Sequence, residues 1–525
     1  MAKVLISDKL SERAIDIFRE RGLEVDFKPG LSVEEQMAII GDYDGLAIRS
    51  ATKVTAEMLA AAPNLKLVGR AGIGVDNVDI PAATARGVVV MNTPHGNTIT
   101  TAEHAIAMLF ATARQIPAAD ASTQAGKWEK SRFMGVELTA KTLGLIGCGN
   151  IGAIVAERAL GLRMRVLAYD PFLSEDRARD LGVEKADLDT VLARADFITL
   201  HTPMTDQTRG MINAEALAKC KPGVRIVNCA RGGLVVEDDL AAALESGHVA
   251  GAAFDVFVEE PAKTNSLFGK PNFIATPHLG ASTEEAQENV ALQVADQMAD
   301  YLLTGAVSNA INMPSISAED APKLKPYMEL ASRLGSFAGQ LTETGLKKVT
   351  LTYRGQVAAL NTRPLTAIAL EGLLKPLVNS VNMVNAPVLA RERGIEVVEV
   401  SNEEIENYQA TITVSVETDR RSRSASGAIF GGEPRLVQLH DARMEAELQG
   451  EMLFVRNADK PGFIGRLGSA LGDAGVNIAN FHLGRAEGDG SAVALIQLDG
   501  TCPPDMVKTL EALPDVLTVR QLKFD

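Results

Sequence analysis

Residues 144–152, with the sequence GLIGCGNIG, constrain the fold more than any other part of the 525-residue chain. A strand pattern precedes this segment and a helical pattern follows it, so Gly147, Gly149 and Gly152 form G-x-G-x-x-G at a strand-to-helix turn. The first glycine permits a tight turn, the second lets the backbone approach a pyrophosphate, and the third allows close helix packing. Free N–H groups at the helix N-terminus would bind the phosphates. Glycine-rich turns are common, so the context of the motif decides its meaning.

Short apolar strand patterns alternate with helical patterns on both sides of this motif. One series runs from residue 3 to about 95, and a second starts near Leu138. Such alternation predicts an α/β fold with doubly wound parallel sheets. A long helix is expected over residues 99–114, and the polar helix after residue 282 could return to the first domain. We therefore expect two Rossmann-like domains, one of residues 1–98 completed by 285–312 and one of residues 99–284.

The C-terminal part divides into two smaller regions. The sequence INMPSI, which is rich in breakers, indicates a domain boundary. Residues 313–449 combine helices, strands and a glycine-rich stretch, which predicts an α+β domain with no visible catalytic constellation. Residues 450–525 follow the order β-α-β-β-α-β, which is typical of a small ferredoxin-like sheet with helices on one face.

The composition limits the partners of the chain. The net charge of −15 argues against nucleic acid or an anionic membrane as a partner. Four scattered cysteines lack metal-ligand spacing, so we expect reduced thiols and no metal site. The N-terminus enters a strand pattern directly, and no apolar run reaches the ~18 residues of a membrane span. These features predict a cytoplasmic protein.

The strand after the glycine motif indicates which dinucleotide binds. Asp170 ends that strand, 18 residues after Gly152. A carboxylate at this position hydrogen-bonds the ribose hydroxyls and repels a 2′-phosphate. Because no Arg or Lys follows at once in PFLSED, the sequence favours NAD over NADP. The plainer alternative is that Asp170 is a turn residue at the end of a strand.

Three polar residues downstream of the motif carry the chemistry of a hydride transfer: Arg231 in VNCARGG, Glu260 in FVEEP and His278 in ATPHLG. Arg231 can hold a substrate carboxylate with two hydrogen bonds. His278 can take a hydroxyl proton, and Glu260 can stabilise the resulting imidazolium. Taken singly, they could be a surface ion pair, a solvated acid and a structural turn histidine. Together they predict oxidation of a 2-hydroxy acid, with Asp255 placed to approach the nicotinamide amide.

These residues lie in stretches that resemble the D-2-hydroxyacid dehydrogenase family from about residue 45 to 285. The matching stretches are GRAGIGVDNVD, TPHGNTITTAEH, GKWEKSRFMG, the glycine motif, HTP, NCARGG, DVFVEEP and PHLGAST. The resemblance implies the roles given above for Arg231, Glu260 and His278, and Glu at position 260 argues against the formate dehydrogenase branch. It also implies NAD contacts at Gly147, Gly149, Asn150, Ile151, Gly152, Asp170, Thr202, Cys229, Ala230, Arg231, Asp255, His278 and Gly280.

Within that family, LAIRSATKVT and the stretches above look most like the members that oxidise 3-phosphoglycerate to 3-phosphohydroxypyruvate in serine biosynthesis. The expected substrate contacts are Arg49 and Ser50 for the phosphate, the amides of Gly72, Ile73 and Gly74 for the carboxylate, Asn97, and again Arg231 and His278. Lys53, Arg70 and Arg132 are further candidate cations, although any of them could be a surface charge. The alternatives are another substrate, such as glycerate or glyoxylate, and an NADH-sensing corepressor built on the same fold.

The C-terminal regions also resemble known modules. Residues 450–525 are similar to an ACT domain, and in serine-regulated relatives the effector contacts correspond to Asn457, Asp459 and Asn477. Relatives have other residue types at the first two positions, so L-serine as effector and a role in dimerisation alone both stay open. Residues 313–449 resemble an intervening domain with an implied role in anion or substrate binding, for which Arg421, Arg423 and His440 are candidates. The resemblance implies a homotetramer, formed through the helix at 99–114 and Trp128.

Overall fold

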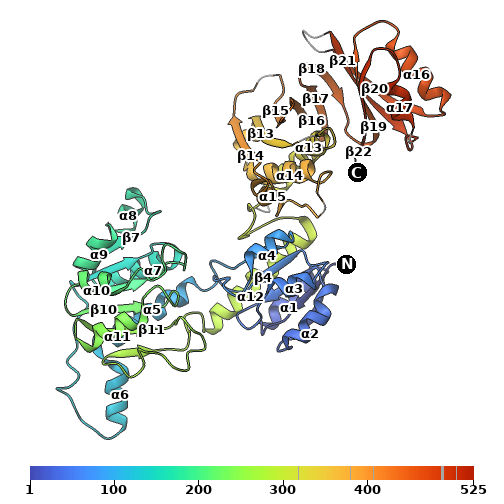
Figure 1. Ribbon diagram of the computed structural model, residues 1–525. Helices are drawn as coiled ribbons and strands as arrows, with labels where there is room; N and C mark the ends of the chain where they lie inside the picture. Colours follow the sequence, from blue (N-terminus) through green and yellow to red (C-terminus); the bar gives the residue numbers. More distant parts are fainter. Residues whose placement is uncertain are drawn as a thin grey trace.

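The computed structural model describes residues 1–316, 319–343, 345–378, 380–405, 407–485, 490–503 and 505–524. Four sheets, each with its own helices, form successive lobes (Figure 1). The N-terminal lobe lies between the second lobe and the C-terminal half of the chain. No helix within the described ranges is long and apolar enough to cross a membrane.

The N-terminal lobe contains a five-stranded parallel sheet of order β2-β1-β3-β4-β5. Its strands are β1 (Lys3–Ile6), β2 (Glu24–Phe27), β3 (Gly45–Ile48), β4 (Leu67–Arg70) and β5 (Val89–Met91). The connecting helices are α1 (Glu12–Glu20), α2 (Val33–Ile39), η1 (Ile40–Asp42), α3 (Ala56–Ala60) and α4 (Ile80–Ala85). Side chains of Ser11, Ser32, Thr55 and Asp79 cap the four α-helices, which explains where these helices begin.

A helix from far along the chain completes this lobe. Helix α12 (Glu284–Thr304) packs on the sheet, and its Val294 and Met298 are fully buried there. The contact is so close that a Cβ added at Gly69 of β4 would lie 2.2 Å from the Met298 sulfur. Arg21, after α1, forms an ion pair with Asp300 at 2.6 Å. The return of α12 therefore ties the second lobe to the first.

The second lobe contains a seven-stranded parallel sheet of order β12-β11-β10-β9-β6-β7-β8. Its strands are β6 (Thr142–Ile146), β7 (Arg165–Tyr169), β8 (Glu184–Lys185), β9 (Phe197–Leu200), β10 (Val224–Asn228), β11 (Val249–Phe254) and β12 (Phe273–Ala275). Its helices are α5 (Thr98–Arg114), α6 (Ile116–Gln124), α7 (Asn150–Gly161), α8 (Glu175–Leu181), α9 (Leu188–Arg194), α10 (Ala214–Lys219) and α11 (Glu237–Glu245). Helix α6 projects away from the lobe (Figure 1). The doubly wound fold that the alternating pattern predicts is confirmed.

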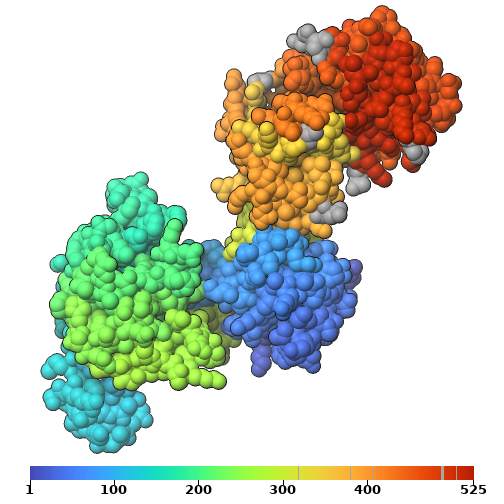
Figure 2. Space-filling view, in the orientation of Figure 1, coloured from blue at the N-terminus to red at the C-terminus, as the bar shows by residue number. Residues whose placement is uncertain are grey.

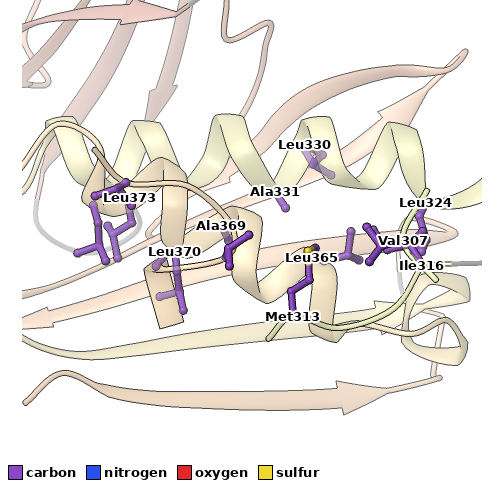
Figure 3. Packing of buried hydrophobic residues seen from close by; sticks show 14 of the residues in the cluster. Val307, Met313, Ile316, Leu324, Leu330, Ala331, Leu365, Ala369, Leu370 and Leu373 are labelled. Carbon is purple, nitrogen blue, oxygen red and sulfur yellow. The ribbon is translucent and has the colours of Figure 1, made fainter. Parts of the chain in front are cut away.

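The third lobe has a mixed sheet of order β14-β13-β15-β16-β17-β18, parallel between β13 and β14 and antiparallel elsewhere. The strands are β13 (Leu346–Gly355), β14 (Glu396–Asn402), β15 (Ala410–Thr418), β16 (Ser422–Phe430), β17 (Glu433–Leu439) and β18 (Ala442–Ala446). The helices are α13 (Ala321–Gln340), η2 (Gln356–Ala359), α14 (Arg363–Leu374) and α15 (Ala386–Glu392). Figure 3 shows α13 and α14 packing side by side through buried residues such as Leu330, Ala331, Leu365 and Ala369.

The last lobe has the predicted β-α-β-β-α-β order, with an antiparallel sheet of order β20-β21-β19-β22. Its elements are β19 (Gly450–Ala458), α16 (Phe463–Asp473), β20 (Asn477–Arg485), β21 (Ser491–Asp499), α17 (Met506–Glu511) and β22 (Val516–Phe524). The third lobe contacts this sheet through α13, where the Phe337 and Phe454 ring centroids are 6.4 Å apart. Gln340 also exchanges two hydrogen bonds with the backbone of Lys523.

Candidate active site

A cleft of about 380 Å³ lies between the first two lobes, with walls from the carboxyl ends of strands in both sheets. In Figure 2 the blue N-terminal lobe and the green second lobe meet along a narrow band. Of the residues predicted to contact the cofactor, those that line the cleft are Asn150, Ile151, Thr202, Cys229, Ala230, Arg231, Asp255, His278 and Gly280. Sequence reasoning gave no role to several others that also line it: Asp76, Pro94, Thr101, His201, Pro203 and Ala281.

The glycine motif forms the turn between β6 and α7. Gly147 has φ +92°, and a Cβ there would lie 2.5 Å from the His201 carbonyl oxygen. A Cβ at Gly152 would lie 2.1 Å from the Gly147 oxygen, whereas a Cβ at Gly149 would have nothing within 4 Å. The first and third glycines are therefore required by packing. The second leaves open space beside the helix N-terminus, which fits the approach of a pyrophosphate.

Asp170 follows β7 and is held against the same turn. Its Oδ2 accepts a hydrogen bond from the Cys148 backbone N–H, and its Oδ1 accepts one from Phe172 N–H, both at 2.8 Å. The carboxylate is thus fixed at the carboxyl end of the strand next to the glycine turn, where an adenosine ribose would be placed.

His278 and Glu260 form a hydrogen-bonded pair, with 2.6 Å between Nδ1 and Oε2. The other Glu260 oxygen accepts a hydrogen bond from the Phe257 N–H at 3.0 Å. Burial would raise the pKa of Glu260, but its hydrogen bond with His278 lowers it overall. The same hydrogen bond raises the pKa of His278 against the effect of burial. This arrangement orients the imidazole and leaves its Nε2 for a substrate hydroxyl.

Arg231 reaches across the cleft to the N-terminal lobe. Its Nε donates to Asp76 Oδ2 at 3.0 Å, and its Nη1 donates to the Ala230 carbonyl at 2.7 Å. The Asn228 side chain holds the surrounding loop, donating to the Arg231 carbonyl at 2.9 Å and accepting from Ala230 N–H at 3.1 Å. Asp76 therefore occupies one edge of the guanidinium that was predicted to bind a carboxylate. Asp76 lies in the stretch GRAGIGVDNVD, but the sequence did not predict its contact with Arg231.

Asp255 is buried beside the loop that carries His278. Its Oδ1 accepts from Thr276 Oγ1 at 2.6 Å and from Leu279 N–H at 2.7 Å, and its Oδ2 accepts from Gly280 N–H at 2.8 Å. His104 Nε2 lies 3.2 Å from Oδ1. Burial would raise the pKa of Asp255, but the bonds from His104, Thr276 and Leu279 lower it. With three of these contacts on Oδ1, Oδ2 keeps acceptor capacity for an amide such as that of nicotinamide.

His201, from the HTP stretch, is a half-buried residue for which the sequence predicted no role. Burial lowers its pKa to about 4, so the ring is neutral. Nε2 lies 2.9 Å from Thr199 Oγ1. Nδ1 is buried and has no hydrogen-bond partner among the described residues.

The predicted phosphate cations are placed differently from one another. Arg70, at the end of β4, lines the cleft, whereas Arg49 and Ser50, after β3, are not among the lining residues. The Arg70 Nε is buried without a hydrogen-bond partner in the described parts of the chain. Burial and the neighbouring Arg231 lower the pKa of Arg70 to about 10. Lys53 is exposed, and Arg132, after α6, pairs with Glu129 at 2.9 Å. Arg70 is therefore the candidate cation that faces the cleft.

The backbone amides predicted to hold the carboxylate divide in the same way. Gly72 N–H already donates to Thr93 Oγ1 at 2.6 Å, which leaves the amides of Ile73 and Gly74 in the cleft wall. A Cβ at Gly74 would lie 1.9 Å from Arg231 Nη2, so a larger residue there would displace the guanidinium. Asn97 is buried in the cleft wall, and its Oδ1 has no partner within the described ranges.

The three candidate effector residues of the last lobe do not come together within one chain. Asn457 pairs with Ala492 near the start of β21, whereas Asn477 pairs with Asp499 at its end. Seven residues of strand separate these positions, about 23 Å. Asn457 is buried, and its Oδ1 has no hydrogen-bond partner among the residues that the structure describes. Asp459 forms an ion pair with Arg485 at 3.1 Å.

Comparison with known proteins identifies the same modules. A model described as D-isomer specific 2-hydroxyacid dehydrogenase, NAD binding domain, matches residues 106–280. A D-3-phosphoglycerate dehydrogenase intervening domain matches residues 323–440, and an ACT domain matches residues 452–515.

Similar proteins extend this match to the whole chain. A D-3-phosphoglycerate dehydrogenase from Synechocystis sp. is 44% identical, covering 99% of this chain and 95% of that protein. Another, from Bacillus subtilis, is 42% identical, and the match covers 99% of this chain and 99% of that protein. The crystal structure of the TT0316 protein from Thermus thermophilus has a TM-score of 0.54 and 34% identity, covering 59% of this chain and 99% of that one. The chain therefore belongs to the D-3-phosphoglycerate dehydrogenase family, among the NAD-binding D-isomer specific 2-hydroxyacid dehydrogenases.

Proposed function

We propose that this protein oxidises 3-phosphoglycerate to 3-phosphohydroxypyruvate with NAD, in the phosphorylated route to serine. One observation carries the proposal: Arg231, the His278–Glu260 pair and Arg70 converge on a single cleft beside the dinucleotide turn. The full-length similarity to D-3-phosphoglycerate dehydrogenases supports the choice of substrate.

Each side chain has one task in this reaction. Arg231 binds the substrate carboxylate, for which Asp76 must give up part of the guanidinium. His278 Nε2 accepts the proton of the 2-hydroxyl group, and the Glu260 carboxylate stabilises the imidazolium. NAD, when bound, supplies the hydride acceptor; Gly149, Asp170 and Asp255 provide the open turn, ribose acceptor and amide acceptor that it requires. Closure of the two lobes would exclude water and bring the reacting atoms together.

The substrate is tested by NADH oxidation with 3-phosphohydroxypyruvate beside hydroxypyruvate and glyoxylate. We expect a large preference for the phosphorylated acid. Arg70→Gln should raise KM for it at least ~10-fold, since one charge-assisted contact is lost, and should change turnover of hydroxypyruvate little. Lys53→Gln, at an exposed position, serves as the matched control. Equal turnover of the unphosphorylated acids would leave the chemistry in place and contradict the substrate.

The rival function, an NADH-sensing corepressor, predicts no turnover. His278→Asn should reduce kcat by about 10²–10⁴-fold, the usual contribution of a general base. NADH binding, followed by its fluorescence, should remain. A wild-type protein that binds NADH and turns over none of the acids would favour the corepressor.

We also propose that L-serine binds where the last lobes of two chains meet. The supporting observation is that Asn457 and Asn477 lie beside opposite ends of β21. In a pair of antiparallel copies, Asn457 of one chain would therefore lie near Asn477 of the other. Added L-serine should inhibit the dehydrogenase activity of the wild type, and both Asn457→Ala and Asn477→Ala should weaken this inhibition. Inhibition that survives both substitutions would restrict the domain to dimerisation.

A homotetramer and a cytoplasmic location complete the proposal. The projecting arm around α6 carries Trp128 with 86% of its surface exposed, together with exposed Ile116 and Met134. So much exposed apolar surface on one segment is typical of an interaction site. Light scattering should give four chains for the wild type and fewer for Trp128→Glu, while a monomeric wild type would contradict this part.

A further inference from the structure

One side of helix α5 faces the loop that carries His278. Thr101 and His104 are three positions apart, so their side chains lie on the same side of the helix. Thr101 Oγ1 donates a hydrogen bond to the Gly280 carbonyl at 2.8 Å, and His104 Nε2 lies 3.2 Å from Asp255 Oδ1. His278 has φ +56°, a conformation that a non-glycine residue keeps where its surroundings hold it. Two polar side chains of α5 therefore hold the surroundings of His278.

The Asp255 carboxylate is buried without a lysine or arginine partner among the described residues. Its side chain has 0% of its surface exposed, and a buried carboxylate costs free energy unless its charge is compensated. Three of its donors, the Thr276 hydroxyl and the N–H groups of Leu279 and Gly280, are neutral. His104 is the hydrogen-bond partner that can carry a positive charge. Burial would raise the pKa of Asp255, and the hydrogen bond from His104 is the largest effect that lowers it.

The contacts of Asp255 also determine which of its oxygens is left for a ligand. A carboxylate oxygen only accepts hydrogen bonds, so His104 Nε2 must carry a proton. This N–H, the Thr276 hydroxyl and the Leu279 N–H all lie on Oδ1. Oδ2 accepts from the Gly280 N–H, and a Cβ at Gly280, in the cleft wall, would lie 3.2 Å from it. Oδ2 is therefore the oxygen beside the cleft.

We propose that His104 is a positioning residue, which keeps the Asp255 carboxylate ionised and turned so that Oδ2 accepts a hydrogen bond from the carboxamide of nicotinamide. His104 acts through Asp255 and is not among the residues that line the cleft. This role rests on the NAD-binding part of the proposed function. A dinucleotide with an acetyl group in place of the carboxamide has no N–H to donate. His104 therefore determines how strongly the protein prefers NAD over such an analogue.

The test measures binding of NAD and of 3-acetylpyridine adenine dinucleotide by calorimetry, with no hydroxy acid present. The wild type should bind NAD about 10-fold more tightly, the value of one hydrogen bond to a charged group. His104→Leu removes the donor and should reduce this preference to less than ~3-fold, while His104→Gln keeps an N–H donor and should retain it. The matched control is Glu103→Gln, at the exposed neighbouring position of α5, which should leave the preference unchanged.

The pH dependence of this preference separates positioning from packing. The titratable groups that face Asp255 are His104 from α5, Cys229 after β10 and the pair of Glu260 and His278. Burial raises the pKa of the Cys229 thiol, which therefore stays neutral, and titration of His278 affects both dinucleotides alike. The lowered pKa of Asp255 should preserve the wild-type preference from pH 8 to pH 5. In His104→Leu this pKa should rise, so the preference should shrink further as the pH falls.

Thermal unfolding shows whether each variant is folded, and His104→Asn, whose shorter amide does not reach Oδ1, replaces His104→Leu if the latter does not fold. An unchanged preference for NAD in the folded variant would overturn the role of His104. Equal loss of the preference in His104→Leu and His104→Gln would also overturn it, because packing alone would then explain both. A wild type that binds neither dinucleotide would instead contradict the proposed function. A different acid substrate would leave the role of His104 intact.

Discussion

Among single residues, His278 and Glu260 determine how the cleft responds to pH. Their 2.6 Å hydrogen bond raises the pKa of His278, although burial opposes the shift. Oxidation requires the neutral imidazole, so kcat/KM should rise as the pH increases through this raised pKa. Reduction requires the imidazolium and should decline over the same range. Oxidation and reduction therefore depend on the same titrating group, His278, but their rates change in opposite directions with pH.

Replacing Glu260 tests this assignment. Glu260→Gln removes the charge that raises the pKa of His278, so the rising limb for oxidation should move to lower pH, and kcat should fall because the imidazolium is less stabilised. A pH profile of kcat/KM measures both effects. Glu259→Gln, at the exposed neighbouring position, should leave the profile unchanged. An unshifted limb in Glu260→Gln would assign the titration to another group.

The glycines of the dinucleotide turn give a second prediction. Gly152→Ala forces a Cβ to within 2.1 Å of the Gly147 oxygen, so it should destabilise the fold by about 1–3 kcal/mol. Gly149→Ala meets nothing within 4 Å, so it should leave the melting temperature unchanged and raise KM for NAD. Denaturant unfolding and NAD kinetics on both variants separate the two roles. Equal loss of stability would show that the open space at Gly149 is not reserved for a ligand.

The sequence predicted which residues share the cleft better than it predicted their contacts. Arg231, Glu260 and His278 follow strands whose carboxyl ends share one sheet edge, so their convergence was predictable. The preference for Arg49 over Arg70 was not resolvable, because both residues end neighbouring strands and the local turn decides which side chain faces the cleft. Gly72, with φ +146°, belongs to that turn. Asp76 and His104 act through long-range contacts that no local pattern reveals.

At the scale of elements, strands buried on both faces were predictable from their apolar runs, whereas partnerships between elements were not. Helices α13 and α14 of the third lobe approach each other through small residues. A Cβ at Gly335 would lie 2.1 Å from the Ala369 oxygen, and one at Gly339 would lie 2.3 Å from the Leu373 oxygen. Nothing in a single helix pattern identifies the partner that requires these glycines. The order of the six strands in this lobe is equally non-local.

This contact predicts opposite effects for similar substitutions. Gly335→Ala should destabilise the protein by about 1–3 kcal/mol, because α13 and α14 must move apart. Gly468→Ala, in α16 with nothing within 4 Å of its Cβ, should be neutral or stabilise by up to ~1 kcal/mol through helix propensity. Chemical denaturation with a probe in each lobe measures both. A stabilising Gly335→Ala would mean that the two helices are not in close contact in solution.

At the scale of the whole molecule, the proposed substrate is an anion, whereas the protein as a whole is acidic. The net charge is −15, while Arg70 and Arg231 face the cleft and Arg49 lies close enough to influence Arg70. At 50 mM salt the Debye length is about 14 Å, so repulsion by carboxylates farther away than this is already largely screened. Further salt therefore mainly weakens the attraction by the nearby guanidiniums. The phosphate adds charge to the substrate, so its attraction to Arg70 should dominate the salt dependence.

KM for 3-phosphohydroxypyruvate should therefore rise between 50 and 500 mM KCl on the order of several-fold, and KM for hydroxypyruvate should rise less. In Arg70→Gln the two salt dependences should become similar. If KM for the phosphorylated acid instead fell with salt, repulsion by the whole acidic surface would outweigh the cleft, and Arg70 could not be the phosphate contact.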